Sequence, residues 1–239
     1  MIGTTSNRQN IFIMGPARSG TTAVTRFLMS HKDVFLADAK NLKTSPDGAP
    51  TWESGIFCRS ISDRAILNKF SDLDTSVPFI LEKTPDHIFH LKRVLKLFPE
   101  AKIIFTHRDP YSCLLSWKVA QQTFLKGNEN FFQACQRWRR ATEIIGTHLE
   151  HPNIQVIEFS DLTKDTYSEG KKLLSTLGLE ASELSKCLSM MNDPKTERVP
   201  GVVGQTIRGG ATTLSQFEKM LISLICRRQE NFYQRYKSK

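Results

Sequence analysis

Long apolar runs are missing from this 239-residue sequence, and none approaches the roughly 20 residues that a membrane-spanning helix needs. The first ten residues, MIGTTSNRQN, are polar and lack the apolar stretch of a signal peptide. We therefore expect a cytoplasmic protein with no transmembrane segment.

Cysteine is scarce and is not arranged for disulfides or metal binding. The five cysteines are odd in number, include no Cys-x-x-Cys pair and do not stand near histidines at zinc-site spacing. They are Cys58, Cys113, Cys135, Cys187 and Cys226. We expect buried or idle thiols.

Acidic residues are outnumbered, with 24 against 33 lysines and arginines and a formal net charge of +9. This excess favours an anionic ligand: a nucleic acid, an anionic membrane surface or a phosphorylated small molecule. The basic residues are dispersed, and aromatic residues such as Phe12, Phe89 and Trp117 follow core-like patterns instead of alternating with arginine. Both features disfavour nucleic acid as the anionic ligand.

Short apolar runs alternate with amphipathic segments along the chain. Strands are expected at residues 11–14, 79–83, 101–107 and 154–159, and helices at residues 21–31, 87–98, 111–122, 130–149, 167–177 and 214–236. This alternation predicts an α/β fold: one three-layer domain over residues 1–239, with a central parallel sheet and helices on both faces.

The stretch IFIMGPARSGTT looks like a strand that runs into a nucleotide-binding P-loop, but one residue is missing. Gly15 and Gly20 have the spacing of such a loop, whereas the lysine that holds the β and γ phosphates is replaced by Thr21. The glycines and the next helix can still form an anion nest, with Arg18 as its cation and Thr21 and Thr22 as donors. Such a nest suits a single phosphate-like group on a 5′ carbon. A glycine turn with a solvated arginine explains this one pattern equally well.

A second signal is the stretch HRDPYSCLLSW. Arg108 directly follows an expected strand, and the carboxyl end of a parallel strand lies on the ligand side of an α/β sheet. Ser116 follows after about two helical turns and can face the same crevice. An arginine and a hydroxyl can bind a second phosphate. The plain alternative is an arginine paired with Asp109 and a serine on a helix surface.

Together these stretches resemble the sulfotransferases that use 3′-phosphoadenosine 5′-phosphosulfate (PAPS). GPARSGTT resembles their 5′-phosphosulfate loop, and RDPYSCLLS resembles their 3′-phosphate motif with its arginine-to-serine spacing. EKTPDHIFHLKRVLKLFPEAKIIFTHRDP and the later VIEFSDLTKDTYSEGKKLLSTLGL are similar to family members as well. The resemblance covers most of the chain and is weakest in residues 40–78 and 192–213.

The resemblance implies that PAPS donates the sulfuryl group, that no metal is required, and that the acceptor is a hydroxyl or amine of a sugar, phenol or lipid-like molecule. It implies nucleotide contacts from the loop, the second motif and a late segment: Arg18, Ser19, Gly20, Thr21, Thr22, Arg108, Ser116 and Arg208. Residues 192–213 would form a mobile lid over the nucleotide. Residues 40–78 would be an insertion on the acceptor side.

The resemblance also implies two catalytic cations. Arg18 would neutralise the 5′-phosphate leaving group, and Lys83 stands where many members have a lysine near the bridging oxygen and the sulfuryl group. The plain alternative for Lys83 is a strand-end lysine in solvent.

The general base is where the sequence departs from the family. Many members carry a glutamate after the first helix, but that segment here, DVFLADAKNLK, contains none. Asp38 is the nearest carboxylate and the first choice for the base. If the alignment with the family is shifted by a few residues, Asn41 stands at the position of the base. Another branch has a histidine two positions after the strand lysine; here that position is Pro85, and His87 lies two residues further on. The candidates are Asp38, His87 and Glu53 in the insertion, or there is no base.

Two other functions remain open at this point. One is a P-loop kinase of nucleotides or small molecules, which the missing lysine disfavours. The other is a non-catalytic protein that binds PAPS or its product, 3′,5′-adenosine bisphosphate (PAP). The sequence does not indicate an oligomeric state.

Overall fold

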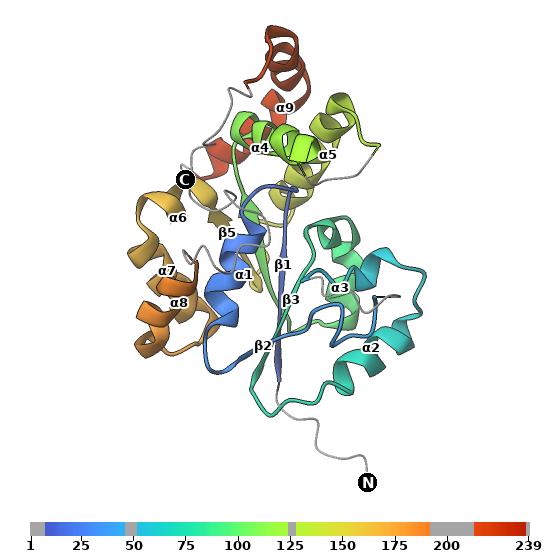
Figure 1. The fold of residues 1–239 in the computed structure, drawn as a ribbon, viewed down its shortest axis with the longest axis vertical. Coiled ribbons are helices and arrows are strands. Elements are labelled where there is room, and N and C mark those ends of the chain that lie inside the picture. The colour runs from blue at the N-terminus through green and yellow to red at the C-terminus, as the bar shows by residue number, and fades with distance from the viewer. Residues whose placement is uncertain (1–7, 46–51, 124–127, 192–212, 238–239) are drawn as a thin grey trace.

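The computed structural model describes residues 8–45, 52–123, 128–191 and 213–237. Its centre is a parallel sheet of five strands in the order β2-β3-β1-β4-β5 (Figure 1). The strands are β1 (Gln9–Met14), β2 (Val34–Leu36), β3 (Phe79–Lys83), β4 (Lys102–His107) and β5 (Ile154–Glu158).

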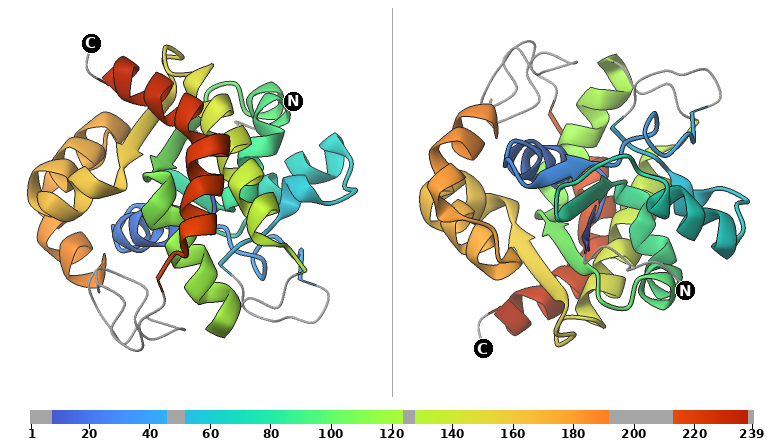
Figure 2. Two further views of the ribbon diagram at one scale, coloured as in Figure 1. Left: turned by 90° about the horizontal axis from the view of Figure 1, so that it is seen from above. Right: turned by 90° about the horizontal axis from the view of Figure 1, so that it is seen from below.

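Helices cover both faces of this sheet. They are α1 (Thr21–Met29), α2 (Asp63–Ser71), α3 (Leu91–Leu97), α4 (Pro110–Thr123), α5 (Phe131–Gly146), α6 (Phe159–Lys164), α7 (Thr166–Leu177), α8 (Leu184–Met191) and α9 (Gln216–Lys237). Helices α1, α7 and α8 contribute to the core on one face, and α3 and α5 to the core on the other (Figures 1 and 2). The predicted α/β fold is confirmed.

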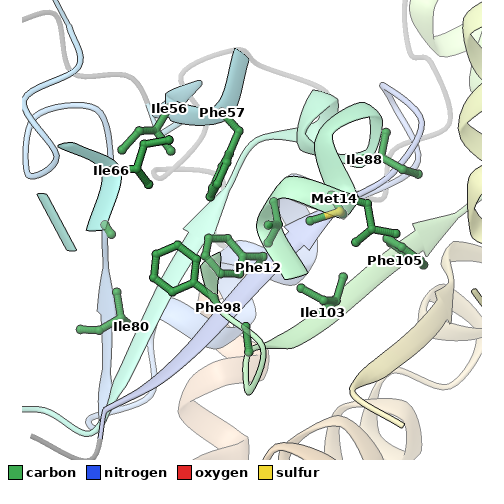
Figure 3. Close-up of a cluster of buried hydrophobic side chains, with 14 of the residues drawn as sticks. Phe12, Met14, Ile56, Phe57, Ile66, Ile80, Ile88, Phe98, Ile103 and Phe105 are labelled. Carbon is green, nitrogen blue, oxygen red and sulfur yellow. The ribbon is translucent and has the colours of Figure 1, made fainter. Parts of the chain in front are cut away.

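The central strand β1 is buried on both faces because it lies between β3 and β4. Successive side chains of a strand point to opposite faces. Ile11 and Ile13 therefore join the cluster under α1, α7 and α8, whereas Phe12 joins the opposite one. Figure 3 shows Phe12 between Phe57 and Phe98, whose ring centroids lie 5.8 and 5.3 Å from its own.

The strand order reverses beside β1. Strands β2 and β3 lie on one side of β1, and β4 and β5 lie on the other. In α/β sheets of this kind, ligands bind at the carboxyl ends of the strands where the order reverses. The loops that follow β1 and β4 are therefore the first place to look for a site.

The structure adds elements that the sequence analysis did not foresee. The edge strand β2 has only three residues, and the insertion at 40–78 contains α2 and a 3-10 helix at Ile56–Cys58. The single helix expected at 87–98 is a 3-10 helix, Pro85–His90, followed by α3. Within the described part of the chain, no helix is both long enough and apolar enough to cross a membrane. Every cysteine is a free thiol, and only Cys58 is exposed.

Candidate functional site

The loop between β1 and α1 has a shape that requires its two glycines. Gly15 has φ 155°, and a Cβ there would lie 2.4 Å from the carbonyl oxygen of Thr106. Gly20 has φ 104°, and a Cβ there would lie 2.3 Å from a ring carbon of Phe159. Arg18 also has a left-handed backbone, with φ 72°, which is uncommon for a residue with a side chain. Such strain is typical of functional loops.

The hydroxyl groups of this loop are used differently. Ser19 is fully buried, and its Oγ lies 2.6 Å from Thr106 Oγ1 on β4. The Ser19 side chain therefore holds the loop against the sheet. Thr21 is also buried, whereas Thr22 is partly exposed at the first turn of α1. Thr22 is thus the accessible hydroxyl of the predicted pair.

Arg18, Arg108 and Ser116 come together at the reversal point of the sheet. Arg18 Nε donates a hydrogen bond to Ser116 Oγ at 3.2 Å, and Arg108 Nη1 donates to the Arg18 carbonyl oxygen at 3.5 Å. The Arg108 guanidinium also lies over the ring of Phe159, 4.8 Å from its centroid. Trp138 Nε1 donates to the Arg108 carbonyl oxygen at 3.1 Å and so fixes the backbone there. The spacing that linked Arg108 to Ser116 in the sequence corresponds to proximity in space.

Two guanidinium groups in one half-buried place repel each other. Burial lowers the pKa of Arg18, and the positive charge of Arg108 contributes a further lowering. The carboxylate of Asp109 is directed to the start of α4, where its Oδ1 accepts the N–H of Ser112 at 2.9 Å. An anion between the two arginines would relieve the repulsion.

A lysine–glutamate pair lies beside the same loop. Lys83 pairs with Ile13 of β1 in the sheet register, and the Gly15 N–H donates to the carbonyl oxygen of Pro85 at 3.3 Å. Lys83 Nζ donates to Glu53 Oε1 at 2.6 Å. The Lys83 side chain is only 3% exposed, whereas that of Glu53 is 48% exposed. Glu53 also acts electrostatically on Arg18, so it lies near both cations.

The segment that carries Glu53 is held by a buried carboxylate. Glu82 is fully buried in β3 and accepts hydrogen bonds from Ser54 Oγ and Thr84 Oγ1, each at 2.7 Å, and from His87 Nδ1 at 2.8 Å. Burial alone would raise the pKa of Glu82, but His87 and these hydrogen bonds outweigh it and lower that pKa. Glu82 is therefore an ionised anchor inside the protein.

The same network reaches the backbone of the insertion. The Gly55 N–H donates to Thr84 Oγ1 at 3.1 Å, and the Phe57 N–H donates to His87 Nε2 at 3.3 Å. Burial opposes protonation of His87, but the Glu82 carboxylate and Cys58 together outweigh burial and raise the pKa of His87 to about 9. Nδ1 donates to Glu82 in either protonation state, whereas Nε2 accepts the Phe57 N–H in the neutral ring. Both ring nitrogens of His87 are thus engaged inside the protein.

The remaining predicted residues lie elsewhere. Asp38 follows the edge strand β2, and its Oδ1 accepts the N–H of Asn41 at 2.8 Å; Asn41 Nδ2 donates to the carbonyl oxygen of Leu36. These side chains stabilise the turn after β2. Arg208 and nearly all of the proposed lid at 192–213 lie outside the described residues. No group of three potential metal ligands occurs in the part of the chain that the structure describes.

Sequence reasoning missed the Glu82 network and ranked Glu53 below Asp38. One signal was available, because a glutamate stands in the otherwise apolar strand FILEK. A buried strand of a parallel sheet is normally apolar throughout, so Glu82 indicated a buried polar network. The contact between Glu53 and Lys83 had no comparable signal, since 30 residues separate the two in sequence.

Comparison with known proteins is consistent with this geometry. Residues 52–183, more than half of the chain, match the model of the sulfotransferase family. The match includes Glu53, Lys83, Arg108 and Ser116 and begins after the glycine loop. Among curated proteins no significant match is found.

Solved structures share the fold at low sequence identity. The sulfotransferase from Alicyclobacillus acidocaldarius is 14% identical, with a TM-score of 0.58 and coverage of 94% of each chain. The sulfotransferase domain of the Synechococcus PCC 7002 olefin synthase is 14% identical, with a TM-score of 0.56, covering 94% of this chain and 96% of that one. The mouse sulfotransferase SULT7A1, complexed with PAP, is 16% identical, with a TM-score of 0.58, and the match covers 95% of this chain and 89% of that one. At these identities the likeness concerns the fold.

Proposed function

Because this chain belongs to the sulfotransferase family, we propose that it transfers a sulfuryl group from PAPS to a hydroxyl or amine of a small-molecule acceptor. The observation that carries the proposal is the meeting of Arg18, Arg108 and Ser116 where the strand order reverses. The donor nucleotide carries phosphate at both its 3′ and 5′ positions, and this site offers a cation and a hydroxyl from two different loops.

The glycine loop suits the 5′ end of the donor. Gly15 and Gly20 leave room where a Cβ would collide with neighbouring atoms, so the backbone can follow the curve of an anion nest. Arg18 supplies the positive charge, and Thr22 supplies a hydroxyl at the start of α1. Arg108 and Ser116 would hold the 3′-phosphate, with the Phe159 ring keeping the guanidinium in place.

Lys83 and Glu53 are the groups that we assign to the transfer step. Bound PAPS supplies the sulfuryl group and a phosphate leaving group. Lys83 Nζ, nearly excluded from solvent, would donate hydrogen bonds to the sulfuryl oxygens and to the bridging oxygen. Glu53 would take the proton of the acceptor as the new sulfur–oxygen or sulfur–nitrogen bond forms. As the bond from sulfur to the 5′-phosphate breaks, Arg18 would neutralise the charge that develops on that phosphate.

Glu53 replaces Asp38 as the proposed base. A base must reach the acceptor and lie next to the reacting group. Two observations support Glu53: its side chain is about half exposed, and it contacts Lys83 directly. Asp38 is engaged in the turn after an edge strand, and His87 is fully buried with both nitrogens occupied. His87 and Glu82 are therefore assigned to positioning.

Calorimetric titration with PAP tests the nucleotide site. We expect micromolar binding that does not depend on magnesium and that is lost in Arg18→Ala and in Arg108→Ala. Arg64→Ala, which changes an exposed arginine on α2, is the matched control and should bind as the wild type does. Absence of PAP binding, or a clear preference for ATP with magnesium, would overturn the proposal in favour of a P-loop kinase.

Transfer itself requires a second measurement. The purified protein would be incubated with PAPS and panels of sugars, phenols and lipid headgroups, and PAP release would be followed together with the mass of the acceptor. A sulfated product establishes the enzyme. Tight PAP binding with no product from any panel would instead indicate the non-catalytic nucleotide-binding protein.

A further inference from the structure

The last helix, α9, has a clear division between its inner and outer sides. It runs across one end of the molecule, in front of α4 and α5 in the left view of Figure 2. Ile222, Cys226 and Tyr233 are buried, which places one side of the helix against the core. This side makes extensive contact with α5.

The two acidic residues of α9 are also directed away from the outer side. Glu218 pairs with Lys118 of α4 at 2.8 Å, and Glu230 lies 3.5 Å from His107 Nε2 at the end of β4. The side chains of Glu218 and Glu230 are only 16% and 18% exposed. The outer side of α9 therefore keeps no carboxylate of its own.

Large apolar side chains occupy much of the outer side. Phe217 is 64% exposed and Leu224 is 74% exposed; Phe232 is 56% exposed, although one edge of its ring lies against Gly146 of α5. Single exposed apolar residues are ordinary on protein surfaces, but a series along one helix indicates an interaction surface. Met220 follows Phe217 at helical spacing and is also exposed.

Arginines stand among these apolar residues. Arg227 and Arg228 are exposed and make no ion pair with another described residue. They line a groove along α9 together with Leu224, Asn231 and Phe232. Successive positions 217, 220, 224, 228 and 231 follow the three-and-four spacing of one helical side, so the apolar and cationic groups form one continuous surface.

We propose that this outer side of α9 docks on an anionic lipid surface. A membrane interface accepts both kinds of group, because phosphates bind the arginines while the protruding apolar side chains enter the acyl boundary. A second copy of the chain would present an equally cationic helix, and two such sides repel each other. Double-stranded nucleic acid, whose bases are stacked inside the duplex, would leave the exposed phenylalanines and leucine without partners. The proposal is independent of sulfuryl transfer.

Vesicle co-sedimentation of the full chain tests this docking. We expect binding to vesicles of phosphatidylcholine mixed with phosphatidylglycerol and no binding to phosphatidylcholine alone. Replacing Arg227 and Arg228 with glutamine should weaken binding by about thirtyfold. Leu224→Ser should weaken it by about tenfold, because one inserted apolar side chain is lost.

The matched control removes two charges from another side of the molecule. Lys171→Gln with Lys172→Gln changes two exposed lysines of α7, which lies apart from α9 in Figure 1. This variant should bind the anionic vesicles as the wild type does. An equal loss in both double variants would show that net charge alone is responsible, and this would overturn the proposal. So would the absence of vesicle binding, or a dimer in light scattering that Leu224→Ser dissociates.

Discussion

Replacing Glu53 with glutamine tests the proposed base with little change in shape. Glutamine can still accept the hydrogen bond of Lys83 Nζ, which lies 2.6 Å from Glu53 Oε1, but it cannot take up the proton of the acceptor. A positioned general base contributes about 10²- to 10⁴-fold in rate, which is about 3–5 kcal/mol of activation free energy. We expect kcat to fall by a factor in this range.

The effect of Glu53→Gln on stability should be much smaller. The side chain is 48% exposed, so water screens its charge and the ion pair with Lys83 contributes about 1 kcal/mol or less to the free energy of unfolding. PAP affinity should not decrease, because the substitution removes a negative charge near Arg18. If the activation free energy changes several times more than the free energy of unfolding, the loss of rate is due to catalysis and not to misfolding.

Initial rates of PAP release with an identified acceptor measure kcat. Thermal unfolding measures stability, and calorimetry measures PAP affinity. Asp38→Asn is the control, since that carboxylate caps the turn after β2. The assignment of the base is refuted if Glu53→Gln retains the wild-type kcat while Asp38→Asn loses it.

Three further predictions follow from the same geometry. Ser116→Ala should weaken PAP binding about tenfold in calorimetry, because a hydrogen bond to a charged group is lost. It should weaken adenosine 5′-phosphate binding less, because there only the hydrogen bond that positions Arg18 is lost; equal losses for both nucleotides would contradict the 3′ assignment. Gly20 has φ 104°, and a Cβ there would lie 2.3 Å from the Phe159 ring. Gly20→Ala should therefore lower the free energy of unfolding by about 2–5 kcal/mol in urea titrations. An unchanged urea midpoint would show that the loop relaxes around the new side chain. Burial raises the pKa of Glu230, so the folded protein holds this proton more tightly and stability is lost as pH rises from the ordinary glutamate range through the folded pKa. Glu230→Gln should therefore raise the melting temperature at neutral pH and reduce this pH dependence, whereas an unchanged pH profile would exclude the effect.

The local pattern of the sequence was enough to predict the layers of the fold. The apolar runs Ile11–Met14 in β1 and Ile103–Phe105 in β4 are continuous because these inner strands are covered by helices on both faces. Strand β2 was missed because it has only three residues, which is too short to show a strand pattern even though all three are apolar. The resemblance to the sulfotransferases, based on two motifs, is confirmed by the family match.

The sequence also determined which residues follow β1 and β4, and therefore which cations stand at the ligand edge of the sheet. Arg108 lies just before α4 and Ser116 lies within it. Their spacing of about two helical turns was enough to predict that the two side chains face the same crevice, because helical geometry is local. That Arg18 joins them depends only on β1 and β4 being neighbours.

Tertiary structure decided the rest. Ser19 carries a hydroxyl group that could bind a phosphate, yet its Oγ is directed inward and lies 2.6 Å from Thr106 Oγ1 of the adjacent strand β4. The contact between Glu53 and Lys83, on which the proposed base rests, depends on a buried carboxylate, Glu82, that holds the insertion against β3 through Ser54. Contacts across tens of residues depend on how separate elements pack, and the local pattern carries no information about that packing.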